Sequence, residues 1–164
     1  MNKSFTLLGG VLLAFASLAM PIALAAPGET VLYKNPSCKC CDKYAEYLRE
    51  GGFKVSVIAD SAQFQRVSKA SGVPPSLAGC HAMTVDGYVV GGHVPLAAVN
   101  KLLTERPAIR GIALAGMPAG SPGMNGTQQK PFEIYAFDGA KAWLYMTHVL
   151  TDSSATEIWK AINA

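Results

Sequence analysis

The stretch TVLYKNPSCKCCDKYAEYLREGGFKVSVI, residues 30 to 58, determines the predicted fold. It opens with a short β-rich run (30–34) and passes through a cysteine-containing turn into a helical pattern (41–50), where apolar side chains recur at i, i+3 and i+4. Gly51-Gly52 ends this helix, and residues 53–58 then alternate apolar and polar side chains as a half-buried strand does. The stretch therefore predicts strand, helix, strand.

The following residues continue this alternation. A second helix is predicted over 61–71, with Ser61 as its N-terminal cap. Two strands, 82–85 and 88–90, are joined by an Asp-Gly turn, which is a strong hairpin signal. A third helix is predicted over 96–105, ending before a proline. The predicted order is a βαβ unit, a second helix, a hairpin and a third helix.

This order is the layout of an α/β, thioredoxin-like fold. Cys38 and Cys41 form a CxxC motif at the first strand-to-helix junction, which is the redox position of that fold. Cys41 is expected in the first turn of the helix, where the helix dipole stabilises a thiolate.

The amino-acid composition of the chain changes after the third predicted helix. Residues 116–126 form a Gly/Pro/Met-rich loop that excludes regular structure. Two further strands (132–137 and 142–147) predict a small C-terminal β extension, and residues 154–163 a short helix. The predicted domains are a signal peptide (1–25), a thioredoxin-like metal-binding domain (26–138) and a C-terminal extension (139–164).

The first residues have the features of a secretory signal peptide. Lys3 precedes an uncharged apolar run (5–20), and Ala23-Leu24-Ala25 offers small residues for cleavage after Ala25. The alternative is an uncleaved anchor, but the run is short for a bilayer span of about 20 residues. We expect a periplasmic protein without a stable membrane anchor after cleavage. Cleavage removes Lys3 and lowers the formal net charge from +3 to +2, which is too small to indicate a nucleic-acid partner.

The candidate ligands are few and clustered. In the predicted fold, the loop before the hairpin faces the CxxC motif across a cleft, and that loop carries Cys80-His81; His93 follows the hairpin on the same side. His148 is expected to be an ordinary residue at a strand end. The proposed metal ligands are Cys38, Cys40, Cys41, Cys80, His81, His93, Met117 and Met124.

Soft sulfur ligands select Cu(I) and Zn(II), and imidazole suits both. Three thiols within four residues would crowd a single ion. They are better suited to a cluster in which each sulfur bridges several Cu(I) ions, so copper is favoured over zinc. The thioethers of Met117 and Met124 also suit copper. The alternative is that the four cysteines form two structural disulfides, for which three connectivities exist.

Three segments resemble the bacterial CopG-like family: YKNPSCKCCDKYAEYLREGGF (33–53), GVPPSLAGCHAMTVDGYVVGGHVP (72–95) and GMPAGSPGM (116–124). The resemblance runs from Val31 to Phe137. It implies an exported, thioredoxin-like, metal-binding protein associated with copper resistance, with a cysteine-anchored copper site. The ligand residues named above match the family's cysteines, histidines and loop methionines. Redox interconversion of Cu(I) and Cu(II), hence a copper oxidoreductase, is one implied form of this role.

Two functional hypotheses follow, and a third is weaker. The first is a periplasmic protein that binds or redox-cycles copper, with copper ions and other periplasmic copper-handling proteins as partners. The rival is a thiol-disulfide oxidoreductase that uses Cys38 and Cys41. The third is a passive chaperone that hands copper to a partner protein. The loop opposite the CxxC motif discriminates the first hypothesis from the oxidoreductase, because Cys80-His81 suits a metal better than a docked peptide.

Overall fold

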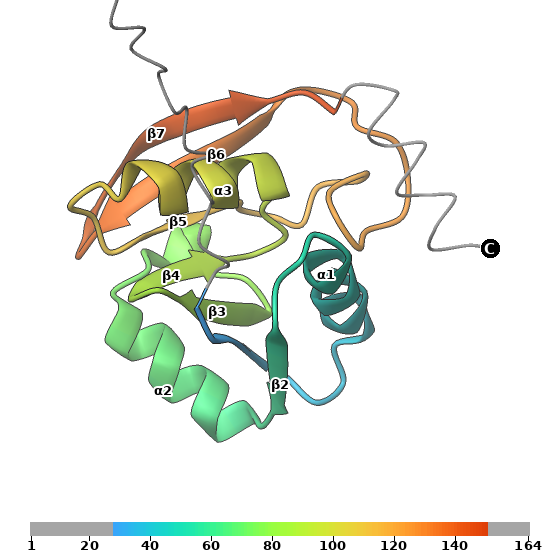
Figure 1. The fold of residues 1–164 in the computed structure, drawn as a ribbon, viewed down its shortest axis with the longest axis vertical. Coiled ribbons are helices and arrows are strands. Elements are labelled where there is room, and N and C mark those ends of the chain that lie inside the picture. The colour runs from blue at the N-terminus through green and yellow to red at the C-terminus, as the bar shows by residue number, and fades with distance from the viewer. Residues whose placement is uncertain (1–27, 151–164) are drawn as a thin grey trace, which may run out of the picture.

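The structure is a computed structural model that describes residues 28–150. Figure 1 shows the arrangement of its helices and strands. In chain order these are β1 (Thr30–Lys34), α1 (Lys39–Glu50), β2 (Val55–Ala59), α2 (Ser61–Ser71), a 3-10 turn (Pro75–Leu77), β3 (His81–Val85), β4 (Tyr88–Gly91), α3 (Leu96–Glu105), β5 (Gly111–Ala113), β6 (Phe132–Asp138) and β7 (Lys141–His148).

All the strands belong to one sheet, in the order β2-β1-β3-β4-β5-β6-β7. β1 is parallel to β2 and antiparallel to β3, and β3 and β4 form the predicted hairpin. The predicted α/β class is confirmed, and the predicted order of βαβ unit, helix, hairpin and helix is observed.

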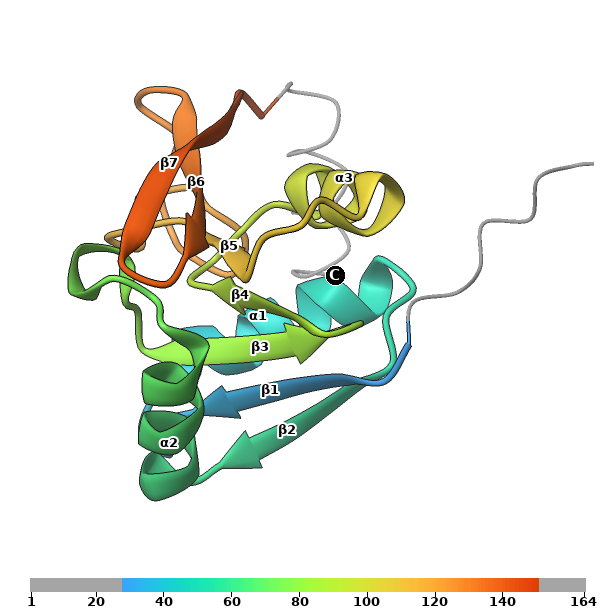
Figure 2. The same cartoon turned by 90° about the vertical axis from the view of Figure 1, so that its left-hand side faces the viewer.

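Helices cover both faces of the sheet. Because side chains alternate along a strand, Met83 of β3 faces the core shared with α1 and α3, whereas its neighbour Ala82 faces the smaller core beneath α2. Figure 2 shows α2 in front of the sheet and α1 behind it. Tyr44 of α1 is among the largest fully buried side chains, so the helix that carries the cysteines is anchored in the main core.

Besides shifts of one or two residues at the ends of β2, β3, β4, β6 and β7, three local features differ from the sequence prediction. α1 begins at Lys39 with Cys38 as its N-cap residue, two positions before the predicted start. The prediction of Ser61 as the cap of α2 was wrong: Asp60 is the cap, because its extended backbone lets its carboxylate accept a hydrogen bond from the Gln63 N–H at 2.7 Å. β5 was not predicted, because it is only three residues long and buried throughout.

The C-terminal β extension is part of the main sheet. The predicted boundary between residues 138 and 139 falls in the turn that joins β6 to β7, and β7 forms the edge of the sheet. The proposed signal peptide (1–25) and the predicted helix (154–163) lie outside the described residues. Within residues 28–150, no helix has the length and apolar character needed to cross a membrane.

Candidate metal centre

The fold brings the four cysteines to one place. Cys38 caps α1, and Cys40 and Cys41 lie in its first turn. The register between β1 and β3 pairs Lys34 with His81, which sets Cys80 beside the end of β1. The Asn35 N–H donates a hydrogen bond to the Cys80 carbonyl at 3.4 Å and fixes this loop. Two segments far apart in sequence therefore meet at the start of α1.

The four sulfur atoms form a compact cluster, called here the four-cysteine cluster (Cys38, Cys40, Cys41 and Cys80). All of them lie within 4.8 Å of one another. Cys38 and Cys41 are joined in a disulfide, and Cys40 and Cys80 are free thiols. The alternative of two disulfides is therefore not observed in the described residues.

The Cys80 sulfur lies beside the disulfide rather than in line with it. Its distance is 3.2 Å to the Cys38 sulfur and 3.2 Å to the Cys41 sulfur. A thiolate that breaks a disulfide approaches one sulfur along the S–S axis. The equal distances are less suited to that attack than to a cage in which several sulfurs face a common centre.

Two buried imidazoles extend this site. One ring nitrogen of His81, one of His93 and the Cys80 sulfur lie within 4.8 Å of one another, and we call these three residues the imidazole cluster. His81 Nδ1 is 4.0 Å from the Cys80 sulfur. Tyr44 packs against both rings, with centroids 5.0 Å from His81 and 5.2 Å from His93. Cys80 belongs to both clusters and joins them.

Backbone carbonyls set the tautomer of each imidazole. His81 Nε2 lies 3.0 Å from the Gly92 carbonyl oxygen, and His93 Nδ1 lies 2.6 Å from the Pro122 carbonyl oxygen. A carbonyl only accepts, so these two nitrogens carry the protons. The lone pairs are then on His81 Nδ1 and His93 Nε2. The latter is the one buried side-chain nitrogen or oxygen of residues 28–150 without a hydrogen-bond partner.

The protonation of both rings suits metal binding. Burial, and next the neighbouring His93, lower the pKa of His81 to about 3. Burial also lowers the pKa of His93. Both rings are therefore neutral at pH 7, the form of imidazole that binds metals. A hydrogen bond from the second ring nitrogen to a backbone carbonyl is the usual support of a metal-binding histidine.

The chain is similar to solved proteins over most of its described length. Two solved structures, titled "Copper resistance protein copG" Form 1 and Form 2, are each 33% identical to it. The match covers 74% of this chain and 98% of each of theirs, with TM-scores of 0.67 and 0.65. The chain belongs to the CopG family. A family model described as "Protein of unknown function, DUF411" matches residues 77–124 of this CopG-family chain. No curated protein matches it.

The two candidate methionines of this CopG-family chain lie in different surroundings. The Met117 sulfur is 3.5 Å from the Cys80 sulfur, and the residue is 37% exposed. Met124 is half-buried further along the loop, where its N–H donates a turn hydrogen bond to Ser121. Among the described residues, the Met117 sulfur contacts a cysteine, whereas the Met124 sulfur forms no such contact. His148, at the end of β7, belongs to neither cluster.

Replacing Met117 by leucine is expected to slow copper exchange without changing the number of ions bound at equilibrium. The thioether is the exposed member of the sulfur set, whereas the thiols and imidazoles remain in place. Stopped-flow transfer of Cu(I) to a chelator, with metal analysis of the loaded protein, measures both quantities. Met124→Leu is the matched control, and equal slowing in both variants would contradict the prediction.

The Gly/Pro-rich loop is docked on the start of α1. Gly123 has φ +78°, and a Cβ there would lie 2.8 Å from the Tyr44 nitrogen and 3.1 Å from the Cys40 carbonyl oxygen. The preceding residue, Pro122, accepts the hydrogen bond from His93. The close backbone approach at Gly123 thus places the carbonyl that orients an imidazole.

Replacing Gly123 by alanine is expected to destabilise the fold by about 1–3 kcal/mol, because positive φ and a backbone collision act together. The free energy of unfolding in urea measures the effect. Gly116→Ala is the control: Gly116 also has positive φ (+76°) but nothing lies within 4 Å of its Cβ position. Equal losses of stability in the two variants would show that the docking of the loop on α1 does not contribute to the free energy of unfolding.

Two buried residues of the site were missed in the sequence. Tyr44 donates its hydroxyl hydrogen bond to the Val94 carbonyl at 2.9 Å and packs against both imidazoles. The Lys34 Nζ donates to the Cys38 carbonyl at 2.9 Å and pairs with Asp42 at 2.8 Å. A signal for Lys34 was available, because it lies two residues after Leu32 on the buried face of β1.

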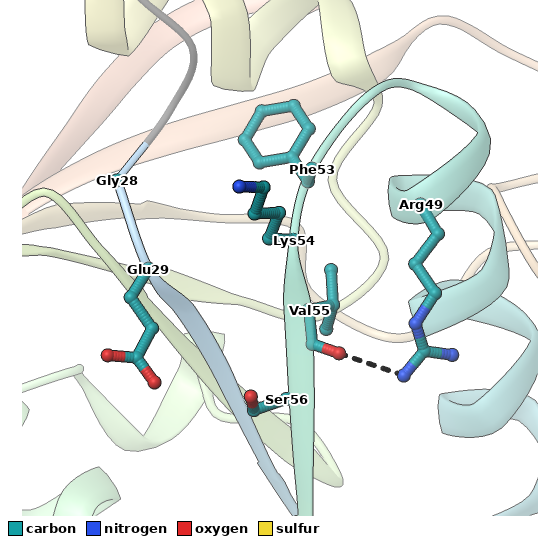
Figure 3. Close-up of a pocket in the computed structure, with 7 residues that line it drawn as sticks. All are labelled: Gly28, Glu29, Arg49, Phe53, Lys54, Val55 and Ser56. Carbon is teal, nitrogen blue, oxygen red and sulfur yellow. Dashed lines mark hydrogen bonds between the residues drawn. The ribbon is translucent and has the colours of Figure 1, made fainter.

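A separate pocket lies at the other end of β1 and α1. Its lining residues are Gly28, Glu29, Arg49, Phe53, Lys54, Val55 and Ser56. Figure 3 shows Arg49 turned toward the Val55 carbonyl, to which it donates a hydrogen bond at 2.9 Å. The lining contains no cysteine or histidine, so this pocket offers no soft metal donors.

Proposed function

We propose that this CopG-family chain is a periplasmic copper-binding protein of copper resistance, and that it holds Cu(I) on the four-cysteine and imidazole clusters. The observation that carries the proposal is the sharing of Cys80 by two adjacent sets of soft donors. The titles of the related structures name copper resistance, and they support the choice of metal.

The donor set suits copper better than zinc. Zinc sites usually hold a single ion in a tetrahedron of well-spaced ligands. Here four sulfur atoms lie within 4.8 Å of one another, and a thioether lies 3.5 Å from one of them. Thiolates bind both Cu(I) and Zn(II), and the added thioether favours Cu(I). One tetrahedral ion uses four ligands, whereas the two clusters and Met117 together offer more donors than that, so we propose a thiolate-bridged cluster.

The Cys38 and Cys41 pair could also exchange electrons with copper, because it can be present as two thiols or as a disulfide. The thiols of Cys38 and Cys41 can each give one electron to a Cu(II) ion. The two sulfurs then form the disulfide, two protons leave, and two Cu(I) ions are produced. The free donors Cys40, Cys80, His81 and His93 remain available to hold Cu(I). The reduced protein would in this way convert Cu(II) to Cu(I), and a reductant that opens the disulfide would restore it.

Anaerobic titration of the reduced exported chain with Cu(I), in competition with a chelator, tests the proposal. We expect more than one tightly bound ion per chain by metal analysis. A single bound ion would retain copper binding and remove the bridged cluster. No binding that competes with the chelator would overturn the proposed function. N-terminal sequencing of the exported protein should begin at Ala26, which tests the signal peptide.

The second candidate is a thiol-disulfide oxidoreductase, favoured by one observation: Cys38 and Cys41 are present as a disulfide at the CxxC position. Against it, Cys41 is fully buried, and Cys80 occupies the space beside the disulfide. An insulin-reduction assay separates the two candidates. Rapid insulin reduction together with weak copper binding would favour the oxidoreductase.

Copper affinity is expected to rise with pH. Burial, and next the neighbouring Cys40, raise the pKa of the Cys80 thiol to about 11, and Lys34 opposes this effect. A copper ion that binds this sulfur at neutral pH must displace a proton. The apparent Cu(I) affinity should therefore increase about tenfold per pH unit for each thiol proton released.

Competition titrations between about pH 6 and pH 8, corrected for the chelator's own titration, measure this slope. His81 adds nothing to it, because burial and His93 lower its pKa to about 3 and the ring is neutral throughout. An affinity that does not change with pH would show that the sulfurs are already thiolates in the free protein.

A further inference from the structure

Lys34 is an ammonium buried at the base of the four-cysteine cluster. Its side chain is only 5% exposed, and it ends β1 on the face that points into the core. Among the buried polar residues of the described chain, Lys34 is the one that carries a formal charge; the others are Thr30, Ser71, His81, His93 and Ser121. Since burying a charge is costly, a lysine at this position requires a reason.

The contacts of Lys34 lie at the cysteines. Its Nζ donates at 2.9 Å to the carbonyl of Cys38, the N-cap residue of α1. The sheet register pairs Lys34 with His81, the first residue of β3, so Cys80, which directly precedes that strand, lies beside the end of β1. The ammonium is therefore set between the two segments that supply the sulfurs.

The salt bridge of Lys34 offsets its charge incompletely. Nζ is 2.8 Å from the Asp42 carboxylate, but the Asp42 side chain is 54% exposed. Water and salt screen an exposed charge much more than a buried one. The exposed carboxylate thus offsets the charge of Lys34 only in part at the cluster, where Cys41 is buried and the other cysteines are half-buried. The two imidazoles add no charge, because burial lowers the pKa of each.

We propose that Lys34 is a positioning residue of the copper site, and that its fixed charge stabilises the complex of the first Cu(I) ion with the thiolates. The inference rests on the proposed function. A Cu(I) ion held by two thiolates carries a net charge of −1, so a cation beside it favours its formation. Lys34 acts through the sulfurs and is not itself a ligand.

If Lys34 had only a structural role, the copper affinities of the variants would differ from those that an electrostatic role predicts. Lys34 could serve only to tie β1 to α1 through Asp42 and the Cys38 carbonyl. Lys34→Met and Asp42→Asn both break the salt bridge, so a structural role predicts weaker copper binding in both variants. The electrostatic role predicts weaker binding in the first variant alone, because that variant removes a positive charge whereas the second removes a negative one.

Chelator competition with the reduced exported chain measures the affinity for the first Cu(I) ion. We expect Lys34→Met to weaken it about tenfold, the scale on which a nearby charge shifts ionisation of a thiol. Lys34→Arg should retain affinity within about threefold, since it keeps the charge. Asp42→Asn should bind as tightly as the wild type or more tightly. Lys101→Met, which breaks an exposed pair with Glu105 on α3, is the matched control and should change nothing.

Weaker binding by Asp42→Asn, or unchanged binding by Lys34→Met, would overturn the inference. Far-UV circular dichroism monitors folding. If Lys34→Met does not fold, Asp42→Asn still decides: tighter or equal binding supports the electrostatic role, and weaker binding contradicts it. A wild-type chain that does not bind Cu(I) would instead overturn the proposed function together with this inference, and is recognised from the wild-type titration alone.

Discussion

Replacing Cys80 by serine is expected to remove most of the high-affinity copper binding. Cys80 is the residue that the four-cysteine cluster and the imidazole cluster share. Its sulfur is 3.2 Å from the sulfurs of Cys38 and Cys41, and 3.5 Å from that of Met117. Serine has a similar size but a hard oxygen, which Cu(I) binds poorly. The loss should exceed about 100-fold, the upper range for residues that only support a ligand.

Cys40→Ser is the matched control for this experiment. Cys40 is also a free thiol, but it belongs to the four-cysteine cluster alone. We therefore expect Cys40→Ser to lose bridged ions and to keep an ion on the imidazole cluster. Chelator competition and metal analysis of both variants measure the difference. A Cys80→Ser protein with wild-type capacity would show that the clusters do not act through their shared sulfur.

Oxidation of Cys38 and Cys41 is expected to lower the copper capacity to a single ion. The disulfide occupies two of the four thiols, whereas Cys80, His81 and His93 keep their free donor atoms. The reduced chain regains the bridging sulfurs and should hold more than one ion. Metal analysis of the oxidised and reduced proteins, after excess Cu(I) has been removed by desalting, measures the ratio.

The double variant Cys38→Ser and Cys41→Ser isolates the cause. It lacks the disulfide under all conditions and lacks the same two thiols. It should bind the same number of ions with and without reductant, close to the value for the oxidised wild type. Loading of the oxidised wild type to the full reduced capacity would contradict the prediction.

The sequence predicts most elements because their signals are local. The bounds of β1, α2 and α3 agree residue for residue with the predicted runs 30–34, 61–71 and 96–105. β5 has no such signal, since Gly111–Ala113 is too short to show alternation. The cap of α2 was misassigned to Ser61 because two adjacent residues can both cap a helix. The backbone geometry at Asp60 decides between them.

The approach of Cys80-His81 and His93 to the CxxC motif follows from topology, and the sulfur and nitrogen distances agree with it. The orientation of the imidazoles was beyond prediction, because the carbonyls of Gly92 and Pro122 lie in irregular segments. Which cysteines pair was equally open, since spacing alone allowed several connectivities.

The exposure of Met117 affects how ions would move between this site and its surroundings. Cys38, Cys40 and Cys80 are half-buried and Cys41 is buried, whereas Met117 is exposed and its sulfur contacts that of Cys80. A copper ion delivered from solution or from another protein would thus meet a neutral donor first. That donor releases no proton on binding. Binding of the ion to Met117 at the surface would then be independent of pH. Its transfer to the thiols would depend on pH, because only that step releases protons.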